Sequence, residues 1–247
     1  RKQGSRAAHS DTKDLIGYEV IPGAKKSVHH VLLYPADAAA AQAADAKTGE
    51  IGWPCFGGPG IKTSSTIGGW VPGSPPTKYP TNTGITLTAG QVLVMQVHYD
   101  NHHGGAWTPD QTSIRLQYSM TPVAKKAAIL SVQNSSFVLP PGATNYAVVG
   151  NLTAPGDGFV YGLLPHAHQL GRRMRVETPD TCMIDIPSWD FNWQQFYFYE
   201  NSQGMAVKKG TPIKLTCVFD NPTTSSVTWG ESTTDEMCLN YFYTTGP

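Results

Sequence analysis

Short runs of β-branched and aromatic residues, separated by clusters of Gly, Pro, Asn and Asp, recur along almost the whole chain. Such runs predict strands, and the clusters between them predict turns. The one helix-like piece is the Ala-rich segment 36–47, which predicts a loop or a short surface helix. The candidate strands are 18–22, 28–35, 84–90, 91–100, 113–120, 127–133, 145–153, 159–170, 172–178, 195–200, 211–220 and 236–244.

This spacing of strands is typical of β-sandwiches and jelly rolls rather than of alternating strand–helix units. The 247 residues suffice for one large or two ordinary domains. A polar, Pro-containing segment at 119–129 separates two strand-rich halves. The sequence therefore predicts an all-β protein with two tandem antiparallel β-sandwich, jelly-roll-like domains, at 1–121 and 122–247.

The charge balance narrows the possible partners. Lys plus Arg and Asp plus Glu both number 18, and charged residues make up only 15% of the chain. We therefore expect no nucleic-acid partner. No apolar run is long enough for a membrane-spanning helix, and the first residues do not resemble a signal peptide. Low charge and sequons at Asn134 and Asn151, two candidate glycosylation sites, favour a secreted, periplasmic or otherwise extracellular protein.

The positions of the histidines indicate a possible metal site. His29 and His30 are adjacent at the head of an apolar strand, where neighbouring side chains should point to opposite faces unless something draws both to one point. His98 ends another strong apolar strand. His166 and His168 are two apart, so on the strand 159–170 they should share one face and offer two imidazoles to a metal.

Each of these features also has a simpler interpretation. The H-x-H pair alone fits two hydrogen-bonded or exposed histidines, and Met237 alone fits a core side chain. His9 lies in a polar terminus, and His102 and His103 in the turn 100–105 are interpreted as surface residues rather than as a further metal site. Taken together, imidazoles and a thioether suit copper, since soft sulfur favours Cu(I) and imidazole binds both oxidation states.

The motifs in this order resemble the type II, ascorbate-dependent copper monooxygenases, the family of dopamine β-monooxygenase and peptidylglycine α-hydroxylating monooxygenase. The resemblance runs from "HHVLLY" to "DEMCLNYFY", over most of the chain. In that family an H-H pair and a later "QVHY" form the first copper site, and an H-x-H pair with the Met of "EMC" forms the second. The matching positions here are His29, His30 and His98 for the first site, and His166, His168 and Met237 for the second.

The resemblance implies two coppers per chain, with ascorbate as the reductant of both. The first copper would relay electrons, and the second would bind O₂ and carry the C–H chemistry. His166, His168, Met237 and Tyr241 are accordingly the expected catalytic residues, and Gln96 is expected beside the first copper. Asp235 and Glu236 are interpreted as loop and supporting residues rather than catalytic acids.

The family also implies a disulfide between Cys217 and Cys238, against the alternative of two buried thiols. In the family, Cys55 would pair with a cysteine upstream of the H-H pair, and residues 1–28 contain none, so either that strand lies outside this sequence or Cys55 pairs differently. A Cys55–Cys182 bridge ranks low because it would cross between the domains. The partner of Cys55 therefore stays open.

The substrate is the weakest part of the resemblance. Leu164 stands where the peptidylglycine enzymes have an Arg that binds the substrate carboxylate, so a peptidyl-glycine loses its main anchor. Tyr241 matches a substrate-side position, and Asn240 is a further polar candidate, although both also fit the alternate faces of a terminal strand. Trp189, Phe191, Trp193 and Tyr197 fit either a pocket or core packing.

The sequence thus predicts a copper- and ascorbate-dependent monooxygenase that inserts one oxygen atom from O₂ into a C–H bond of a small-molecule or peptide substrate. One alternative is an extracellular copper-binding or structural protein without turnover. Another is a plain β-sandwich adhesion or carbohydrate-binding domain with incidental histidines.

Overall fold

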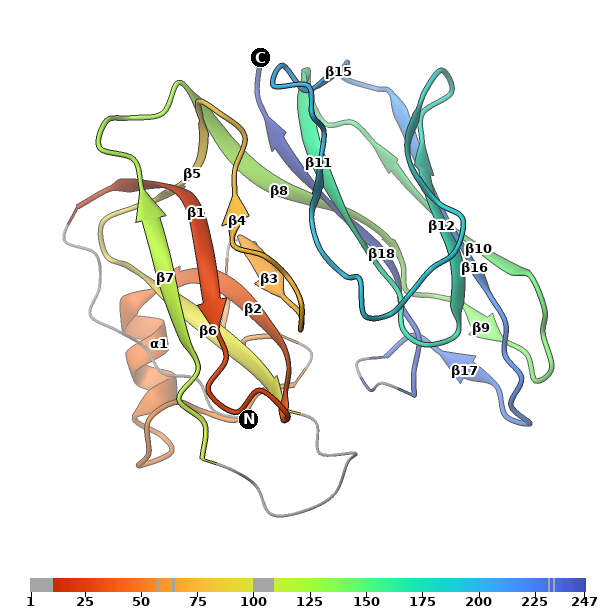
Figure 1. Cartoon of the computed structure of the whole chain (residues 1–247), viewed down its shortest axis with the longest axis horizontal. Helices are drawn as coiled ribbons and strands as arrows, with labels where there is room; N and C mark the ends of the chain where they lie inside the picture. The colour runs from red at the N-terminus through yellow and green to blue at the C-terminus, as the bar shows by residue number, and fades with distance from the viewer. Residues whose placement is uncertain (1–10, 57, 64, 100–108, 231, 233) are drawn as a thin grey trace. The chain divides into compact units, whose positions relative to one another are not determined.

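The protein divides into two compact units, which a computed structural model describes at residues 11–56, 58–63, 65–99, 109–230, 232 and 234–247. Unit 1 comprises Arg1–Ala128 and unit 2 comprises Ile129–Pro247 (Figure 1). The boundary falls inside strand β8 (Lys125–Asn134), so the chain passes from one unit to the other as a strand. Strands dominate the described residues, which confirms the predicted all-β class.

Unit 1 is built from two sheets. One has the order β3-β2-β6, and in the other β1 pairs with β4, β5 and β7. All of these pairs are antiparallel, whereas the short contact between β5 and the start of β8 is parallel. The strands are β1 (Lys13–Ile21), β2 (Val28–Asp37), β3 (Gly68–Trp70), β4 (Thr77–Lys78), β5 (Thr83–Leu87), β6 (Gln91–Tyr99) and β7 (Ser113–Tyr118).

A tyrosine joins the two sheets of unit 1. The Tyr18 hydroxyl on β1 donates a hydrogen bond to the Gly69 carbonyl on β3, at 2.8 Å. A Cβ added at Gly68 would lie only 2.2 Å from that hydroxyl, so the approach requires a glycine. The contact explains why the Gly-rich segment before Trp70 can lie against β1.

The predicted short helix is present as α1 (Ala38–Asp45). The Asp37 side chain accepts the Ala40 N–H at 2.8 Å and caps its N-terminus. Ala41 is fully buried and packs in a small cluster with Trp53 and Val94. No helix in the described part of the chain is long and apolar enough to cross a membrane.

Unit 2 contains two larger sheets and a two-stranded ribbon. One sheet has the order β10-β16-β12-β13, in the other β11 pairs with β14, β15 and β18, and the ribbon is β9 with β17. Besides β8, the strands are β9 (Val138–Leu139), β10 (Tyr146–Thr153), β11 (Gly158–His166), β12 (Gly171–Glu177), β13 (Cys182–Ile186), β14 (Tyr197–Phe198), β15 (Met205–Val207), β16 (Pro212–Phe219), β17 (Val227–Thr228) and β18 (Cys238–Thr245).

The core of unit 2 lies between its two larger sheets. Leu163 of β11 and Phe242 of β18 join one cluster with Met174 of β12 and Leu215 of β16, all at most 1% exposed. Inward-facing residues alternate with outward-facing ones along β16, as expected for a sheet with one buried face. The layering fixes β18, and therefore the residues just before it, against the rest of the unit.

The sequence predictions differ from the structure mainly at strand ends and short strands. β1 begins at Lys13, five residues before the predicted strand. The predicted strand 159–170 ends at His166 in the structure. Strands β3, β4, β9, β13, β15 and β17, none longer than five residues, were not predicted.

Candidate metal centres

The first candidate centre lies on the paired strands β2 and β6 of unit 1. His30 stands directly opposite His98, whereas the neighbouring pair is Val28 with Tyr99, so His29 is an extra residue on β2. Such a β-bulge bends a strand and re-aims a side chain. The bulge explains how two adjacent histidines escape the alternation of faces.

The three imidazoles converge. The Nδ1 atoms of His29 and His30 are 3.1 Å apart, and the ring centroids of His30 and His98 are 4.5 Å apart. One ring nitrogen from each of the three histidines can be chosen so that all lie within 4.8 Å of one another. All three side chains are partly exposed. Three neutral nitrogen donors at this spacing fit a first-row transition metal such as copper.

Gln96 lies two residues before His98 on β6, so its side chain leaves the strand on the same face. The side chain is 5% exposed, and its Nε2 donates to the Gly58 carbonyl at 3.0 Å. Its Oε1 is buried without a hydrogen-bond partner among the described residues. Gln96 is therefore a polar group on the histidine-bearing face of β6, with an acceptor available to a neighbour.

The second candidate centre lies where β11 ends. His166 is the last residue of β11 and pairs with Leu239 of β18. His168 lies beyond the strand, and its ring is edge-on to that of His166 with centroids 5.3 Å apart. The expectation that both histidines share one strand face was therefore wrong. The chain leaves the ladder after His166 because the next backbone donors bind a side chain instead of a strand.

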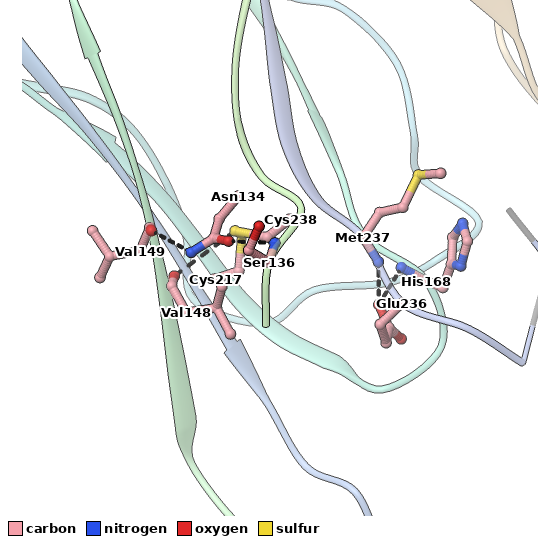
Figure 2. Close-up of a disulfide and its surroundings, with 9 residues drawn as sticks. All are labelled: Asn134, Ser136, Val148, Val149, His168, Cys217, Glu236, Met237 and Cys238. Atoms are coloured by element: carbon pink, nitrogen blue, oxygen red, sulfur yellow. Dashed lines mark hydrogen bonds between the residues drawn. A yellow bond between two sulfur atoms is a disulfide. The ribbon is translucent and has the colours of Figure 1, made fainter. Parts of the chain in front are cut away.

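That side chain is Glu236, whose carboxylate is completely buried. Its Oε2 accepts the backbone N–H of His168 at 2.8 Å and that of Met237 at 3.2 Å, and its Oε1 accepts the N–H of Leu170 at 2.6 Å. Figure 2 shows the two contacts to Oε2. A single oxygen atom thus holds the backbone of His168 and of Met237, and the two amide nitrogens lie no more than about 6 Å apart, the sum of the two hydrogen-bond lengths.

Burial raises the pKa of Glu236 to about 7, although the three backbone N–H groups and the charge of Arg172 favour the ionised form. All three hydrogen-bonding partners are donors, which matches the acceptor-only character of a carboxylate.

The His168 ring is oriented by a backbone carbonyl. Its Nδ1 lies 2.9 Å from the Asp235 oxygen, which can only accept, so Nδ1 carries the proton and Nε2 keeps its lone pair. Burial lowers the pKa of His168 more than the contacts with Asp235 and the Ser232 backbone raise it, which favours the neutral ring. A neutral imidazole is the form that ligates a metal.

The aromatic residues of the segment 189–197 differ in their surroundings. Trp189 is buried, and its Nε1 donates to the His168 carbonyl at 3.2 Å. The Phe191 ring is edge-on to the His168 ring at 5.9 Å. Trp193 is 63% exposed, and its carbonyl accepts the Tyr197 hydroxyl at 3.0 Å. Trp189 and Phe191 therefore pack at the second centre, whereas Trp193 faces solvent.

The face of the sheet beside His166 is uncharged. Leu164 is two residues before His166 and pairs with Tyr241, while His166 pairs with Leu239. Residues opposite each other in a ladder share a face, so Leu164, Leu239 and Tyr241 lie on the face of His166. Asn240 pairs with Pro165 on the other face and is completely buried.

The predicted disulfide is confirmed. Cys217 of β16 is bonded to Cys238 of β18 with a Cα–Cα distance of 5.8 Å, so the bridge joins the two sheets of unit 2 next to Met237 (Figure 2). Cys55 and Cys182 are thiols, and Cys182 is exposed. The low-ranked Cys55–Cys182 bridge is not formed.

Some predicted features lie outside the described residues, namely His9, His102 and His103. Conversely, the sequence reasoning did not assign the Asp235 carbonyl or Trp189 to the second centre. A backbone carbonyl leaves no side-chain signal. Trp189 was noticed only as an aromatic residue, because its contact with His168 depends on a turn that no pattern predicts.

Comparison with known proteins gives the same division into two halves. The family profile described as "Copper type II ascorbate-dependent monooxygenase, N-terminal domain" matches residues 7–106. The profile for the C-terminal domain of the same family matches residues 125–245. Each candidate centre lies within one matched region.

Curated relatives agree with these matches. DBH-like monooxygenase protein 1 of Gallus gallus is 28% identical over 239 residues, covering 87% of this chain and 38% of that protein. Tyramine beta-hydroxylase of Caenorhabditis briggsae is 24% identical over 73% of this chain, and dopamine beta-hydroxylase of Rattus norvegicus is 23% identical over 72%. The chain spans 38% of the length of the Gallus gallus relative and about a third of the other two.

Proposed function

The chain belongs to the copper type II ascorbate-dependent monooxygenase family, and from this premise we propose that it is a working enzyme that inserts one oxygen atom from O₂ into a substrate C–H bond. The observation that carries the proposal is the convergence of His29, His30 and His98 in unit 1. A second set of donors in unit 2, anchored on one buried carboxylate, supports it.

In the proposal, His29, His30 and His98 hold one copper. Three imidazoles are compatible with both oxidation states, so this set can retain the ion while an electron passes. Gln96 lies on the same face of β6 as His98, and its buried Oε1 can accept a hydrogen bond from a ring N–H or a bound water. These residues bind and orient, and no substrate group needs to reach them.

His166, His168 and Met237 would hold the second copper. Copper bound there would supply the oxygen activation and, with electrons from ascorbate, the redox chemistry of the insertion. The Asp235 carbonyl holds His168 Nδ1, which leaves Nε2 as the nitrogen that can bind the metal. The thioether of Met237 is a weak neutral ligand that favours Cu(I). The Phe191 ring contacts the His168 ring in a T-shaped arrangement and can help to orient it.

The substrate is proposed to carry no carboxylate that needs a cationic anchor. Leu164, Leu239 and Tyr241 share the face of His166, and the only polar group among these three side chains is the Tyr241 hydroxyl. Tyr241 is therefore the proposed substrate contact. A peptidyl-glycine is disfavoured, because Leu164 cannot pair with its carboxylate.

We place the protein in an oxidising, extracellular compartment. The disulfide Cys217–Cys238 supports this, since such bonds persist mainly outside the cytosol. The two sequons differ in accessibility. Asn151 is exposed on β10, whereas the side-chain amide of Asn134 donates to the Val149 carbonyl at 2.8 Å. If the protein is glycosylated, Asn151 is the favoured position.

Oxygen uptake and product analysis test the proposal. The copper-loaded protein with ascorbate should consume O₂ and hydroxylate at least one member of a panel of benzylic, phenethylamine and aliphatic compounds. Copper binding with no substrate-dependent oxygen uptake would instead favour a copper-binding module without turnover. No copper binding at all would favour a plain β-sandwich domain with incidental histidines.

A further inference from the structure

Glu236 is the one completely buried carboxylate among the described residues, and no chemical step of the proposed reaction uses it. A carboxylate without solvent is costly unless its oxygens are hydrogen-bonded. Here both oxygens are bonded, and every partner is a backbone N–H. The arrangement therefore stabilises a particular backbone geometry rather than a particular side chain.

The partners of Glu236 belong to two segments far apart in sequence. His168 and Leu170 follow β11, and Met237 precedes β18. Ladder pairing between β11 and β18 extends only as far as His166 with Leu239, so it does not reach His168 or Met237. Beyond that point, the Glu236 carboxylate takes the place of the missing ladder hydrogen bonds.

Other contacts hold parts of the same region but have different consequences. The Asp235 carbonyl orients the His168 ring, and the Trp189 indole holds the His168 carbonyl. The disulfide at Cys238 fixes the start of β18. Only the Glu236 side chain, among the contacts described here, binds the backbone amides of both His168 and Met237 through one atom.

We propose that Glu236 is a positioning residue, whose carboxylate sets the spacing of His168 and Met237 so that an imidazole and a thioether reach the same copper. The inference rests on the proposed function, because it assumes that these two residues share a metal. A carboxylate is suited to the task because two oxygens can accept three N–H groups. A glutamine of the same size has one acceptor oxygen, and its amide nitrogen would face a backbone donor.

The test uses Glu236→Gln in a His30→Ala background, so that the second centre is observed alone. X-ray absorption of the Cu(I)-loaded protein reports the copper–sulfur contact, and competition with a Cu(I) chelator reports affinity. We expect the sulfur contribution to be lost and the affinity to fall roughly 10- to 100-fold, as for other groups that orient metal ligands. Unchanged sulfur scattering and affinity in the folded variant would overturn the proposal.

Asn221→Ala is the matched control. Asn221 is also completely buried, and its side-chain amide donates to the backbone carbonyls of Leu139, Pro140 and Ser225, none of which belongs to a proposed ligand. This variant should lose stability but keep the copper–sulfur contact. If both variants lose the contact equally, Glu236 acts only through the stability of unit 2 and the proposal fails.

A second measurement needs no variant. In the copper-free parent, the amide protons of His168, Leu170 and Met237 should already exchange slowly, because Glu236 holds them before metal arrives. Rapid exchange of these amides that slows only on copper binding would overturn the proposal, even if Glu236→Gln does not fold.

Failure of the proposed function has a different signature. If the parent shows the copper–sulfur contact but hydroxylates no substrate, the proposed enzymatic function is wrong and the positioning role of Glu236 stands. If the parent hydroxylates a substrate and the Glu236→Gln variant keeps its copper–sulfur contact, the positioning role of Glu236 is wrong and the enzymatic function stands. A parent that binds no copper in unit 2 overturns both.

Discussion

The two proposed ligand sets differ in what holds them in place. In unit 1, His30 and His98 face each other within a ladder of nine- and ten-residue strands, and a bulge turns His29 toward them. In unit 2, only His166 lies on a strand, while His168 and Met237 lie just outside β11 and β18 and depend on the Glu236 carboxylate.

This difference separates two ways of building a metal centre. A set held by a ladder is as rigid as the sheet that carries it, which suits a centre that must change oxidation state with little rearrangement. A set held by a few side-chain contacts can be altered without unfolding its sheet. We therefore expect substitutions in unit 2 to affect chemistry and substitutions in unit 1 to affect electron supply.

Replacing Met237 by Leu should give the largest effect. The substitution keeps the volume but removes the thioether, so oxygen-dependent product formation should fall by more than roughly 100-fold, beyond the loss typical of groups that only support a ligand. The copper in unit 1 should remain. Met183→Leu, which alters a buried thioether of unit 2 in β13, is the control and should keep parental activity. Retained activity in Met237→Leu would show that the second set is not the site of oxygen activation.

His98→Ala should fail in a different way. The first set loses one of three imidazoles, so turnover driven by ascorbate should fall by at least roughly 10- to 100-fold, the loss typical of groups that only support a ligand, while copper in unit 2 is unchanged. A single turnover, started by rapidly mixing the fully prereduced protein with O₂ and substrate, separates electron supply from the chemical step. Normal ascorbate-driven turnover in His98→Ala would contradict the relay role of unit 1.

Removing the disulfide should weaken unit 2 alone. Cys217 and Cys238 are 21 residues apart, and opening a loop of that size costs about 3 kcal/mol of unfolding free energy in the chain-entropy estimate. Denaturant unfolding of the double Ser variant should show this loss. A double Ser variant at Cys55 and Cys182 should unfold like the parent. Equal losses of unfolding free energy in the two variants would show that the effect is not due to the Cys217–Cys238 disulfide.

Asp14→Asn should weaken unit 1 by a smaller amount. Burial alone would raise the pKa of Asp14, but hydrogen bonds from Lys126, Thr86 and the Val123 N–H outweigh it and lower the pKa below the usual value. The charged form therefore stabilises the fold above pH ~4, and this contribution is lost as pH falls through the lowered pKa.

The expected loss for Asp14→Asn is about 1.5–3 kcal/mol near pH 7, the range for hydrogen bonds to a charged group. Unfolding measured at pH 7 and again near pH 3 should show the difference between parent and variant shrinking at the lower pH. A difference that is independent of pH would show that the charge of Asp14 does not contribute.

The comparison also shows where sequence reasoning succeeds. Strand-forming runs are local patterns, so the all-β class could be predicted, and the histidine motifs singled out the three residues that converge in unit 1. The bulge at His29 could not be predicted, because register depends on how β2 meets β6 rather than on either strand alone. The end of β11 at His166 was missed for a related reason. The backbone N–H groups beyond it bind a carboxylate that is distant in sequence, and the run 159–170 does not reveal that partner.

Copper content is the most direct test of two independent centres in one chain. The account predicts two copper equivalents for the parent, about one for His30→Ala, about one for a His166→Ala/His168→Ala double variant, and none when the three substitutions are combined. A parent that holds fewer than one equivalent, or a single-centre variant that loses both, would contradict it.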